Sequence, residues 1–344
     1  MASKVSLSDV AAAAGVSIST ASRALSGAGR VSAATRAHVL ATAERLQFQP
    51  DVLARSFVTG KSFIVGILAE NAPGLFSMPL VIGANDFLGR QGIASLTLDG
   101  HETPQVLVEH LKRLKARRVD GLLVIGDNPD LANVAWAIDF PAPVVYAFSV
   151  PGPGKDILVL PDNQAAGAMA GEHLVRLGRR HIAHITADRA FPAVEQRWAG
   201  LLGVLERERL RPVLGGPLHG DYKRHWGAEA ARRLLDSGEP MDAIFAANDE
   251  IALGAYAVLA QAGLRIPDDV AIVGYDNWRG LTSRWERLLT TIDPCLVEVG
   301  QVAAARLLEA VAGEGEHGVH RVPCTLIEGR TTLGPTFGPY EMLL

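Results

Sequence analysis

Hydrophobic and polar residues follow two different patterns along the chain, and the pattern changes near residue 62. Before this point, small apolar residues recur at three- and four-residue intervals between Ser and Gly residues, which predicts three short helices. After it, apolar runs without strict alternation are separated by longer segments with helical spacing. Such runs predict parallel strands in sheets that helices cover on both faces. The pattern therefore predicts a small all-α domain followed by a larger α/β body.

Serine and glycine residues mark the ends of the three predicted helices. Ser6 and Asp9 have the spacing of a capping box. Gly15 can end the first helix because glycine tolerates a positive φ. Ser17 and Ser32 can then cap the second and third helices. Two short helices joined by a tight glycine turn, with a third helix against them, form a helix-turn-helix.

The second helix, within GVSISTASRALSG, carries small and hydroxyl side chains and a single arginine. Small side chains allow a close approach, hydroxyls can bond phosphates or base edges, and arginine can donate two hydrogen bonds to guanine. We predict that this helix lies in the major groove of double-stranded DNA. The residues predicted to contact DNA are Ser17, Ile18, Ser19, Thr20, Ser22 and Arg23. A small helical bundle without a role in nucleic-acid binding is the alternative.

The body contains two successive sets of strands. The first set is predicted at 63–70, 94–100, 120–127 and 142–149, and the second at 156–163, 181–188, near 218, 242–249 and 270–277. Two such sets predict two doubly wound parallel-sheet subdomains. Ligands bind to these sheets at the carboxyl ends of the strands. We therefore expect a ligand cleft where the two groups of strand ends face each other.

Charge is distributed unevenly along the 344-residue chain. Residues 1–61 contain seven Lys and Arg against three Asp and Glu, a net charge of +4, so the total of −4 leaves −8 for the rest. A basic head on an acidic body indicates that the head meets a polyanion. Cys295 and Cys324 match no zinc or redox spacing. No apolar run approaches the roughly 20 residues of a membrane span and no secretory signal is evident, so we expect a cytoplasmic protein.

Several long fragments resemble the LacI family of bacterial transcription regulators. In the head they are LSDVAAAAGVSISTASRALSG and VSAATRAHVLATAERLQFQPDVLARSFVTGKS. In the body they include RRVDGLLV, AAGAMAGEHLVRLGRRHIAHIT and AIFAANDEIALGAYAVLAQAGLRIPDDVAIVGYDN. The resemblance runs from about residue 5 to residue 332. It implies a helix-turn-helix head, a hinge and a periplasmic-binding-protein-like (type I) effector domain.

The resemblance also implies domain boundaries. The helix-turn-helix domain would span 1–49, the hinge helix and linker 50–61, and the effector-binding and dimerisation domain 62–344. Within the body, an N-subdomain would comprise about 62–161 and 293–325, and a C-subdomain about 162–292 and 326–344. The chain would cross between them near 161–164, 291–294 and 325–328.

The segment QPDVLARSF corresponds to the family's hinge, which becomes helical on operator DNA and lies in the minor groove at the dimer axis. A large apolar side chain there wedges between base pairs and kinks the duplex. Phe57 stands at that position, where a leucine is usual, and packing of Phe57 on the body is the alternative. Ala54 is small enough for two hinge helices to approach, and Arg55 would contact phosphate or the groove edge.

Three polar residues follow predicted strands in the second set, where a cleft is expected. Arg197, Asn248 and Asp276 together offer directional hydrogen bonds that suit a polyol. Family members contact their effector from the matching positions. The alternatives are a surface salt bridge for Arg197, a helix cap for Asn248 and a turn cap for Asp276. Asp249 is predicted to cap the helix over 250–262.

Aromatic residues extend the predicted effector site. Tyr222 and Trp278 are placed to stack on the apolar face of a sugar, with ordinary packing as the alternative. Phe76 and Ser77 would face the cleft from the first subdomain. Phe148 stands where the family often has an acid, which makes the pocket more apolar. These features favour a bulky or partly apolar sugar, such as an oligosaccharide or a glycoside.

Enzymatic signatures are missing from the body. The first strand–helix junction, GILAENAPGLFS, lacks the G-x-G-x-x-G of a dinucleotide site, and no Walker loop or Ser/His/acid set appears. His181 and His184 lie three residues apart on one strand, so they point to different faces and are interpreted as structural. We therefore interpret the body as a binding module without catalysis and without a cofactor.

Taken together, these features predict a sequence-specific DNA-binding transcription regulator, most consistent with a repressor, whose operator affinity is controlled by a sugar or glycoside. It should bind palindromic DNA as a homodimer, since each head would contact one half-site. Residues 333–344 lack a leucine heptad, which favours a dimer over a tetramer. The alternatives are a cytoplasmic solute-binding sensor without gene regulation and a sugar-processing enzyme, and the basic head argues against both.

Overall fold

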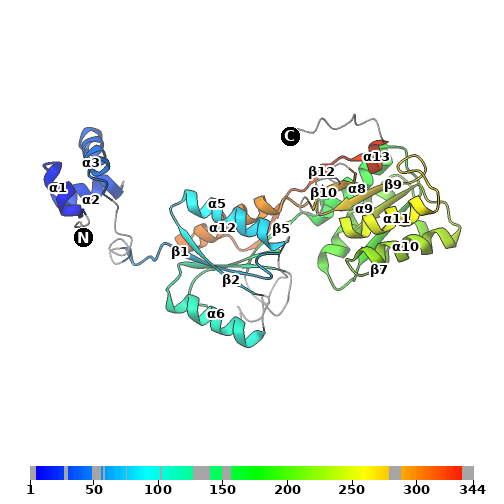
Figure 1. Ribbon diagram of the computed structural model, residues 1–344, viewed down its shortest axis with the longest axis horizontal. Coiled ribbons are helices and arrows are strands. Elements are labelled where there is room, and N and C mark those ends of the chain that lie inside the picture. The colour runs from blue at the N-terminus through cyan, green and yellow to red at the C-terminus, as the bar shows by residue number, and fades with distance from the viewer. Residues whose placement is uncertain are drawn as a thin grey trace. The chain divides into compact units, whose positions relative to one another are not determined.

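The computed structural model describes residues 5–26, 30–48, 56, 59–74, 76–100, 103–126, 140–148, 156–278 and 288–334. The chain divides into two compact units, Met1–Phe63 and Ile64–Leu344. The first unit is the all-α head and the second is the α/β body (Figure 1).

The head contains three helices, α1 (Leu7–Ala13), α2 (Ile18–Ser26) and α3 (Ala33–Arg45). The predicted capping box of α1 is confirmed: the Asp9 N–H donates to Ser6 Oγ at 3.3 Å, and the Ser6 N–H donates to the Asp9 carboxylate at 2.8 Å. Ser17 and Ser32 accept hydrogen bonds from backbone N–H groups in the first turns of α2 and α3, each at 3.1 Å. These local bonds explain where each helix begins.

Small side chains form most of the core of the head. The buried residues are Val10, Ala11, Ala14, Ala21, Ala24, Val39 and Ala43. Because alanine side chains are short, the three helices approach one another closely. Gly15 has a φ of 63° between α1 and α2, which is the conformation that glycine adopts without strain. The tight turn of the predicted helix-turn-helix therefore forms as expected.

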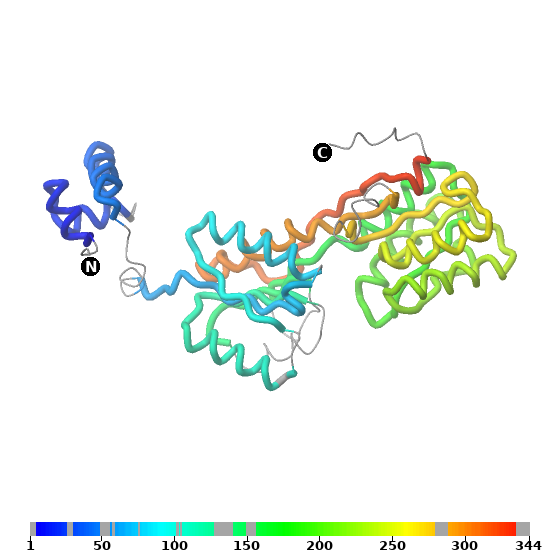
Figure 2. Tube along the Cα trace, in the orientation of Figure 1, coloured from blue at the N-terminus to red at the C-terminus, as the bar shows by residue number. Residues whose placement is uncertain are grey.

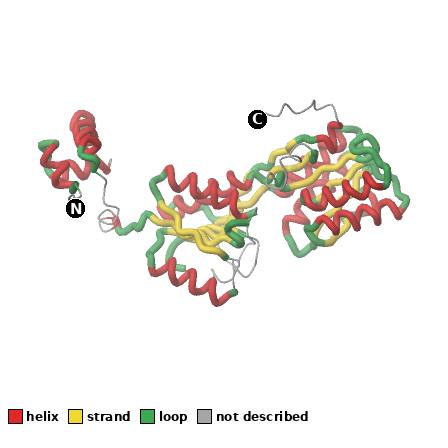
Figure 3. Tube along the Cα trace, viewed as in Figure 1, coloured by secondary structure: helices red, strands yellow, loops and turns green. Residues whose placement is uncertain are grey.

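The first sheet of the body has six parallel strands. Their order is β11 (Gly318–Val322), β5 (Ile157–Pro161), β4 (Val144–Ala147), β3 (Gly121–Ile125), β1 (Ile64–Ala69) and β2 (Ala94–Asp99). Helices α5 (Ser77–Arg90) and α12 (Leu296–Ala312) cover one face, and α6 (Pro104–Ala116) covers the other (Figure 3). We call this sheet and its helices the N-subdomain.

The second sheet also has six strands. Their order is β12 (Thr325–Ile327), β10 (Thr290–Asp293), β9 (Ala271–Tyr275), β8 (Ala243–Ala246), β6 (Ile182–Ala187) and β7 (Leu218–Gly220). One face packs on α8 (Asn163–Arg176) and α9 (Pro192–Arg207), and the other on α10 (Arg224–Ser237) and α11 (Asp249–Gln261). This sheet and its helices form the C-subdomain. Two doubly wound sheets confirm the predicted fold class.

The edge strand β12 differs from the all-parallel expectation because it pairs antiparallel with β10. It follows β11 of the N-subdomain sheet directly. No helix lies between the two strands that could carry the chain to the end of the C-subdomain sheet where β10 begins. A parallel partner would need such a crossover connection. The short connection between β11 and β12 therefore accounts for the reversed direction.

Three segments cross between the subdomains, and they run side by side in Figure 2 in green, orange and red. The crossings follow β5, β10 and β11, and a proline stands at or directly after the end of each strand: Pro161, Pro294 or Pro323. Proline has no N–H to donate to a strand ladder, so it is suited to the point where pairing ends. The second crossing falls slightly later in the chain, and the third slightly earlier, than the sequence predicted.

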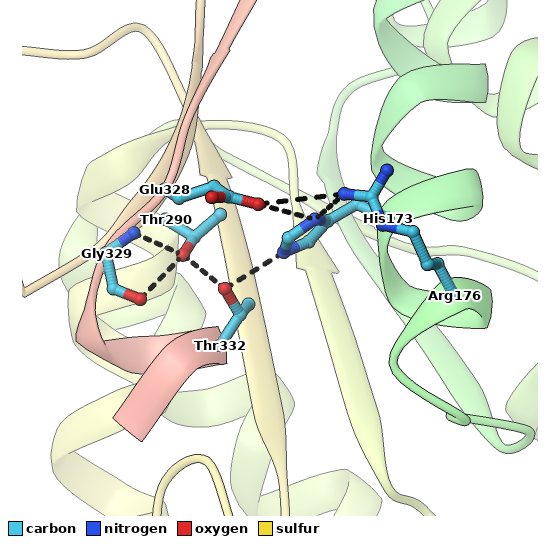
Figure 4. A network of polar contacts seen from close by, with 6 residues as sticks. All are labelled: His173, Arg176, Thr290, Glu328, Gly329 and Thr332. Atoms are coloured by element: carbon cyan, nitrogen blue, oxygen red, sulfur yellow. Dashed lines mark hydrogen bonds and ion pairs between the residues drawn. The ribbon is translucent and has the colours of Figure 1, made fainter. Parts of the chain in front are cut away.

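A polar network holds the last described segment, including α13 (Arg330–Leu333), against the C-subdomain (Figure 4). Thr290 Oγ1 accepts from the Gly329 N–H at 2.8 Å and contacts Thr332 Oγ1 at 2.6 Å. Buried His173 contacts Thr332 Oγ1 through Nε2 at 2.9 Å, while Arg176 donates to its Nδ1 at 2.9 Å. This arrangement requires a neutral imidazole that carries its proton on Nε2. Burial lowers the pKa of His173, in agreement with that state.

Candidate functional site

The outer face of α2 exposes most of the residues predicted to contact DNA. Ser17, Ile18, Ser19, Ser22 and Arg23 are exposed, and Thr20 is half-buried. Ile18 is 54% exposed, although isoleucine is usually a core residue. The opposite face of α2 supplies Ala21 and Ala24 to the core of the head. Ala54, Arg55 and Phe57 lie outside the described residues.

Hydroxyl groups at the start of α2 are held in a defined arrangement. Ser17 Oγ lies 2.9 Å from Ser19 Oγ and 2.8 Å from Thr20 Oγ1, in addition to capping the helix. A helix N-terminus with hydroxyl side chains can bind phosphate oxygens through both N–H and O–H donors. The geometry of α2 is therefore suitable for contact with a nucleic-acid backbone.

A cleft of about 520 Å³ lies in the body at the carboxyl ends of strands from both sheets. Its size is within the range of small-molecule sites, about 300–1,000 Å³. All eight side chains predicted to contact an effector line it: Phe76, Ser77, Phe148, Arg197, Tyr222, Asn248, Asp276 and Trp278. The fold thus brings together residues as distant in the sequence as Phe76 and Trp278.

Arg197 is buried in the cleft wall, with 3% of its surface exposed. Its Nη1 donates to Asn163 Oδ1 at 2.7 Å, and its Nη2 donates to the Tyr222 hydroxyl at 3.3 Å. The guanidinium carbon lies 4.3 Å from the centre of the Tyr275 ring. Close packing of α8 on α9 sets the position of Arg197, because a Cβ at Gly167 would overlap its carbonyl oxygen.

Asn163 and Tyr275 were not identified from the sequence, although both line the cleft and orient Arg197. The Tyr275 hydroxyl donates to Asn163 Oδ1 at 3.1 Å, so one amide oxygen joins β9, α8 and α9. The only signal was their position: each stands at a strand end, next to a polar residue. Their partners are distant in the chain, so local pattern could not assign them a role.

Asn248 has two roles in the structure. Its Oδ1 accepts from the Ile251 N–H at 2.8 Å and caps α11, while its Nδ2 donates to the Tyr222 carbonyl at 2.9 Å. The prediction that Asp249 caps this helix is therefore wrong. The Asp249 side chain instead accepts from Thr291 Oγ1 at 2.6 Å and from the Trp278 N–H at 3.1 Å.

Two carboxyl groups lie close enough to affect each other: Asp249, which is buried, and Asp276, which is half-buried and lines the cleft. Burial raises the pKa of Asp249 to about 7, and its hydrogen bonds to Thr291 and to backbone N–H groups partly offset this effect. The pKa of Asp276 is raised well above its usual value, first by burial and then by the nearby Asp249 carboxylate. The guanidinium of Arg197 opposes the shift at Asp276.

The N-subdomain side of the cleft has an apolar aromatic surface beside the polar residues Glu70, Asn71 and Arg321. Phe76 and Phe148 pack edge to face with ring centres 4.1 Å apart, and the Ser77 hydroxyl donates to the backbone carbonyl of Glu70. Leu158 and Leu160 continue this wall. The C-subdomain side carries a polar cluster, which consists of Arg197, Asn163, Asn248 and Asp276, beside the apolar residues Phe191, Pro192 and Ala193. The cleft therefore presents the Phe76–Phe148 surface on one side and the polar cluster around Arg197 on the other.

Backbone strain and unpartnered polar atoms occur in the cleft. Asp276 and Phe148 have φ values of 105° and 58°, in a region that L-residues rarely adopt. Among the described residues, Gln196 Oε1, Arg197 Nε and Trp278 Nε1 are buried without a hydrogen-bond partner. Strained residues and unsatisfied buried groups cluster at ligand sites, where a bound molecule can complete the missing bonds.

The part of the chain that the structure describes has neither a metal cluster nor a membrane-spanning helix. It contains no group of three or more His, Cys, Asp or Glu side chains arranged to hold a metal ion. None of its helices has both the length and the apolar character that a bilayer span requires.

The head and the cleft together define a class: a DNA-binding protein with a ligand-binding body. Residues 6–51 match the model of bacterial regulatory proteins of the lacI family, and residues 172–332 match that of a periplasmic binding protein-like domain. The lactose operon repressor of Escherichia coli (strain K12) is 31% identical over 96% of this chain and 91% of its own length. The chain belongs to the LacI family.

Other relatives and solved structures agree with this assignment. The ribose operon repressor of Escherichia coli (strain K12) is 30% identical over 89% of this chain and 92% of its own length. The lac repressor dimer bound to operator and the anti-inducer ONPF matches with a TM-score of 0.68 and 27% identity, over 96% of this chain and 100% of that chain. The CelR–cellobiose complex matches with a TM-score of 0.65 and 27% identity, over 94% and 98% of the two chains. The chain is accordingly a DNA-binding transcription regulator with an effector domain.

Proposed function

We propose that this protein is a homodimeric repressor that binds a palindromic operator through α2 and is controlled by a glycoside or oligosaccharide bound in the cleft. The observation that carries the proposal is the cleft itself, where the eight predicted residues contribute both polar groups and an apolar aromatic surface. The polar groups suit the hydroxyl groups of a sugar, and the apolar surface around Phe76 and Phe148 suits a substituent or a second ring.

The hydrogen-bonding groups of the cleft support a polyhydroxylated ligand. Arg197 Nε and Trp278 Nε1 are buried donors without a partner among the described residues, and Gln196 Oε1 is an acceptor in the same state. A sugar hydroxyl both donates and accepts, so one ligand could satisfy donors and acceptors on the same wall. Asp276, at the end of β9, adds a carboxyl group on this wall.

The ligands of similar proteins agree with this chemistry. The lac repressor has been solved with ONPG, the CelR regulator with cellobiose, and a LacI-family regulator from Enterococcus faecium with ribose. The apolar wall around Phe76 and Phe148 favours a ligand with a bulky apolar part over a small, uniformly polar pentose. We therefore place aryl glycosides and disaccharides ahead of free monosaccharides.

On the DNA side, Arg23 and the hydroxyl residues of α2 would contact bases and phosphates in the major groove. Ile18 is the exposed apolar residue of α2, and a thymine methyl group is a suitable partner for it. Ala54, Arg55 and Phe57 would form the minor-groove hinge, with Phe57 as the wedge. This last assignment rests on the resemblance of QPDVLARSF to the family's hinge.

Control by the effector requires the ligand to prefer one arrangement of the two subdomains. The cleft is lined from both subdomains, so a ligand that contacts both walls favours their closure. Closure would change the positions of the N-subdomains within a dimer and hence the spacing of the segments that lead to the heads. Operator affinity would then change through coupling between two distinct sites.

The same proposal includes two narrower statements. The body binds its effector without chemical conversion, in keeping with relatives that are repressors, such as the lactose operon repressor. The protein acts in the cytoplasm, where operator DNA is accessible.

The first experiment is selection of binding sites from a random duplex library with the purified protein at a stated salt concentration, since phosphate contacts make affinity salt-dependent. An enriched palindrome is the expected result. The R23A variant should lose specific binding, whereas R45A, which alters an exposed arginine at the end of α3, should retain it. Failure to retain any DNA, with or without candidate sugars, would contradict the proposal.

The effector is tested separately by calorimetry. Glycosides, disaccharides, monosaccharides and purines are titrated into the protein in parallel. Binding of an aryl glycoside or a disaccharide, lost in a D276N variant, is the expected result. Binding of purines alone would contradict the carbohydrate assignment while leaving the DNA-binding function intact.

A further inference from the structure

The loop that follows β9 carries two of the residues that line the cleft, Asp276 and Trp278. We call residues 276–278 the β9 loop. Its backbone is strained, because Asp276 has a φ of 105° and Asn277 a φ of 48°. Such conformations persist only where the surrounding structure enforces them. The contacts that hold the β9 loop therefore decide where the two cleft residues lie.

A second pocket, of about 600 Å³, also borders the β9 loop. All three residues of the loop line it, together with residues of α5, of α12 and of the crossing after β10. Because Asp276 and Trp278 line both the cleft and this pocket, the loop forms a partition between them. A partition has fewer packed neighbours than a buried segment, so its position depends strongly on hydrogen bonds.

The backbone N–H groups of the β9 loop all donate to partners on β10 or at the start of α11. In chain order, the acceptors are the Ile292 carbonyl at 2.9 Å, Thr291 Oγ1 at 3.3 Å and the Asp249 carboxylate at 3.1 Å. The side chain of Asn277 adds a fourth bond, from its Nδ2 to Asp293 Oδ2 at 2.7 Å. This bond is the shortest of the four, and a carboxylate acceptor makes it stronger than a bond between neutral groups.

Asp293 also accepts a hydrogen bond at the start of an N-subdomain helix. Its Oδ1 accepts from the N–H of Cys295, which stands directly before α12, at 2.7 Å. Helix α12 packs closely on α5, because a Cβ at Gly83 would overlap the Val297 carbonyl. Asp293 therefore binds the β9 loop of the C-subdomain with one oxygen and the start of α12 with the other.

We propose that Asn277 and Asp293 are positioning residues of the effector site, since their hydrogen bond holds the β9 loop in the cleft wall and joins that wall to α12. The proposal rests on the proposed function, which places the effector in this cleft. Asparagine suits position 277 because it tolerates a left-handed backbone and also carries a donor. Glycine would relieve the strain but could not donate to Asp293.

The test exchanges the two side chains. N277D places two carboxylates against each other, so the hydrogen bond is lost and the charges repel. N277D/D293N restores a bond between an amide and a carboxylate with the roles exchanged, and aspartate tolerates a positive φ as asparagine does. The control variant is D269N, which removes a carboxylate that accepts from the Arg265 N–H near the start of β9, the end remote from the β9 loop.

Two quantities are measured on the full-length protein at pH 8, which disfavours a proton shared between the two carboxylates. Amide hydrogen exchange, followed by mass spectrometry in peptides that contain residues 276–278, reports on the β9 loop without a ligand. Calorimetry with ONPG and with cellobiose reports on the affinity of the cleft. Neither measurement depends on the head.

We expect N277D to exchange roughly tenfold faster or more in these peptides, and to bind the sugar roughly tenfold more weakly, because a hydrogen bond to a charged acceptor is lost. N277D/D293N should recover most of both quantities, and D269N should match the wild type. N277G removes the donor while suiting the positive φ, so it provides the same comparison if N277D does not fold.

Wild-type exchange in N277D, or fast exchange that persists in N277D/D293N, would overturn the proposal. Unchanged affinity of N277D for a sugar that binds the wild type would overturn it as well, because the pair would then hold the loop without serving the effector site. If neither sugar binds the wild type, the carbohydrate effector itself is in question, while the exchange rates still decide whether the pair holds the β9 loop.

Discussion

Substitution of Arg197 by methionine tests whether this residue mainly binds the ligand or mainly stabilises the fold. The guanidinium is 3% exposed and its hydrogen-bond partners, Asn163 and Tyr222, are neutral. Methionine has a similar length, no charge and a flexible apolar chain that fills irregular space. The variant therefore removes the charge while leaving the packing of α8 on α9 largely unchanged.

The expected stability change can be worked from the contacts. The charged hydrogen bond to Asn163 contributes about 1.5–3 kcal/mol, and stacking on Tyr275 up to about 2 kcal/mol. Against these stands the desolvation of a buried cation, which costs several kcal/mol when no carboxylate compensates it fully. Asn163 keeps its bond from the Tyr275 hydroxyl, so the substitution leaves this acceptor with a partner. We expect a net change in unfolding free energy within about 2 kcal/mol of zero.

Ligand binding should respond very differently. A sugar that loses two hydrogen bonds from Arg197 loses about 3–4 kcal/mol, which is roughly 100- to 1,000-fold in Kd. Calorimetry with a glycoside that binds wild type measures this loss, and urea unfolding measures stability. R224M, which removes an exposed arginine paired with Glu250, should change neither quantity much. A variant destabilised by more than about 4 kcal/mol, or one that still binds the glycoside normally, would refute the reasoning.

Three further predictions concern the fold and its pH dependence. Burial raises the pKa of Asp249 from its usual value of 3.8 to about 7, so the folded state holds the extra proton between these values. The contribution of Asp249 to the unfolding free energy is therefore greatest at low pH and falls by a few kcal/mol as pH rises from 4 to 7. Urea unfolding of wild type and D249N at several pH values measures it, because the difference between their unfolding free energies should show the same fall. A difference that does not change with pH would contradict the prediction. G167A should destabilise the body by about 2 kcal/mol, because its Cβ would overlap a carbonyl of α9. G203A has open space around it and should stabilise the body by up to about 1 kcal/mol. Equal melting temperatures for the two variants would contradict the prediction, because they would mean that α8 and α9 can move apart without cost. S6A should lower the stability of the head by about 0.5–2 kcal/mol through loss of the capping box, seen in the circular dichroism melt of the head, and no change there would mean that the cap contributes nothing.

Local chemistry determined much of this protein before the chain folded. The caps at Ser6, Ser17 and Ser32 and the turn at Gly15 depend on neighbours within three or four residues, and each formed where the sequence placed it. The strands of both sheets were predictable for a similar reason. Apolar runs between helical segments can be buried in only a few ways, and parallel sheets covered on both faces are the usual one.

The effector cleft shows where sequence pattern was sufficient and where it was not. Polar residues at strand ends converge whenever parallel strands share a sheet edge, so Arg197, Asn248 and Asp276 could be placed together in advance. The family resemblance added the aromatic positions. The assignment of Asp249 as a cap was wrong because Asn248 has the extended backbone that a cap requires, and the sequence gives no φ and ψ values.

Tertiary structure alone decided the contacts between distant segments. Asn163 and Tyr275 orient Arg197 from positions more than 30 and 70 residues away in the sequence. The local periodicity of the sequence does not predict such contacts. The same holds for α12, which packs on the first sheet although most of that sheet precedes it by more than 100 residues. The pattern of side chains indicates which face of a helix or strand is buried, but it does not indicate which other element packs against that face. That choice is made by the packing of the whole chain.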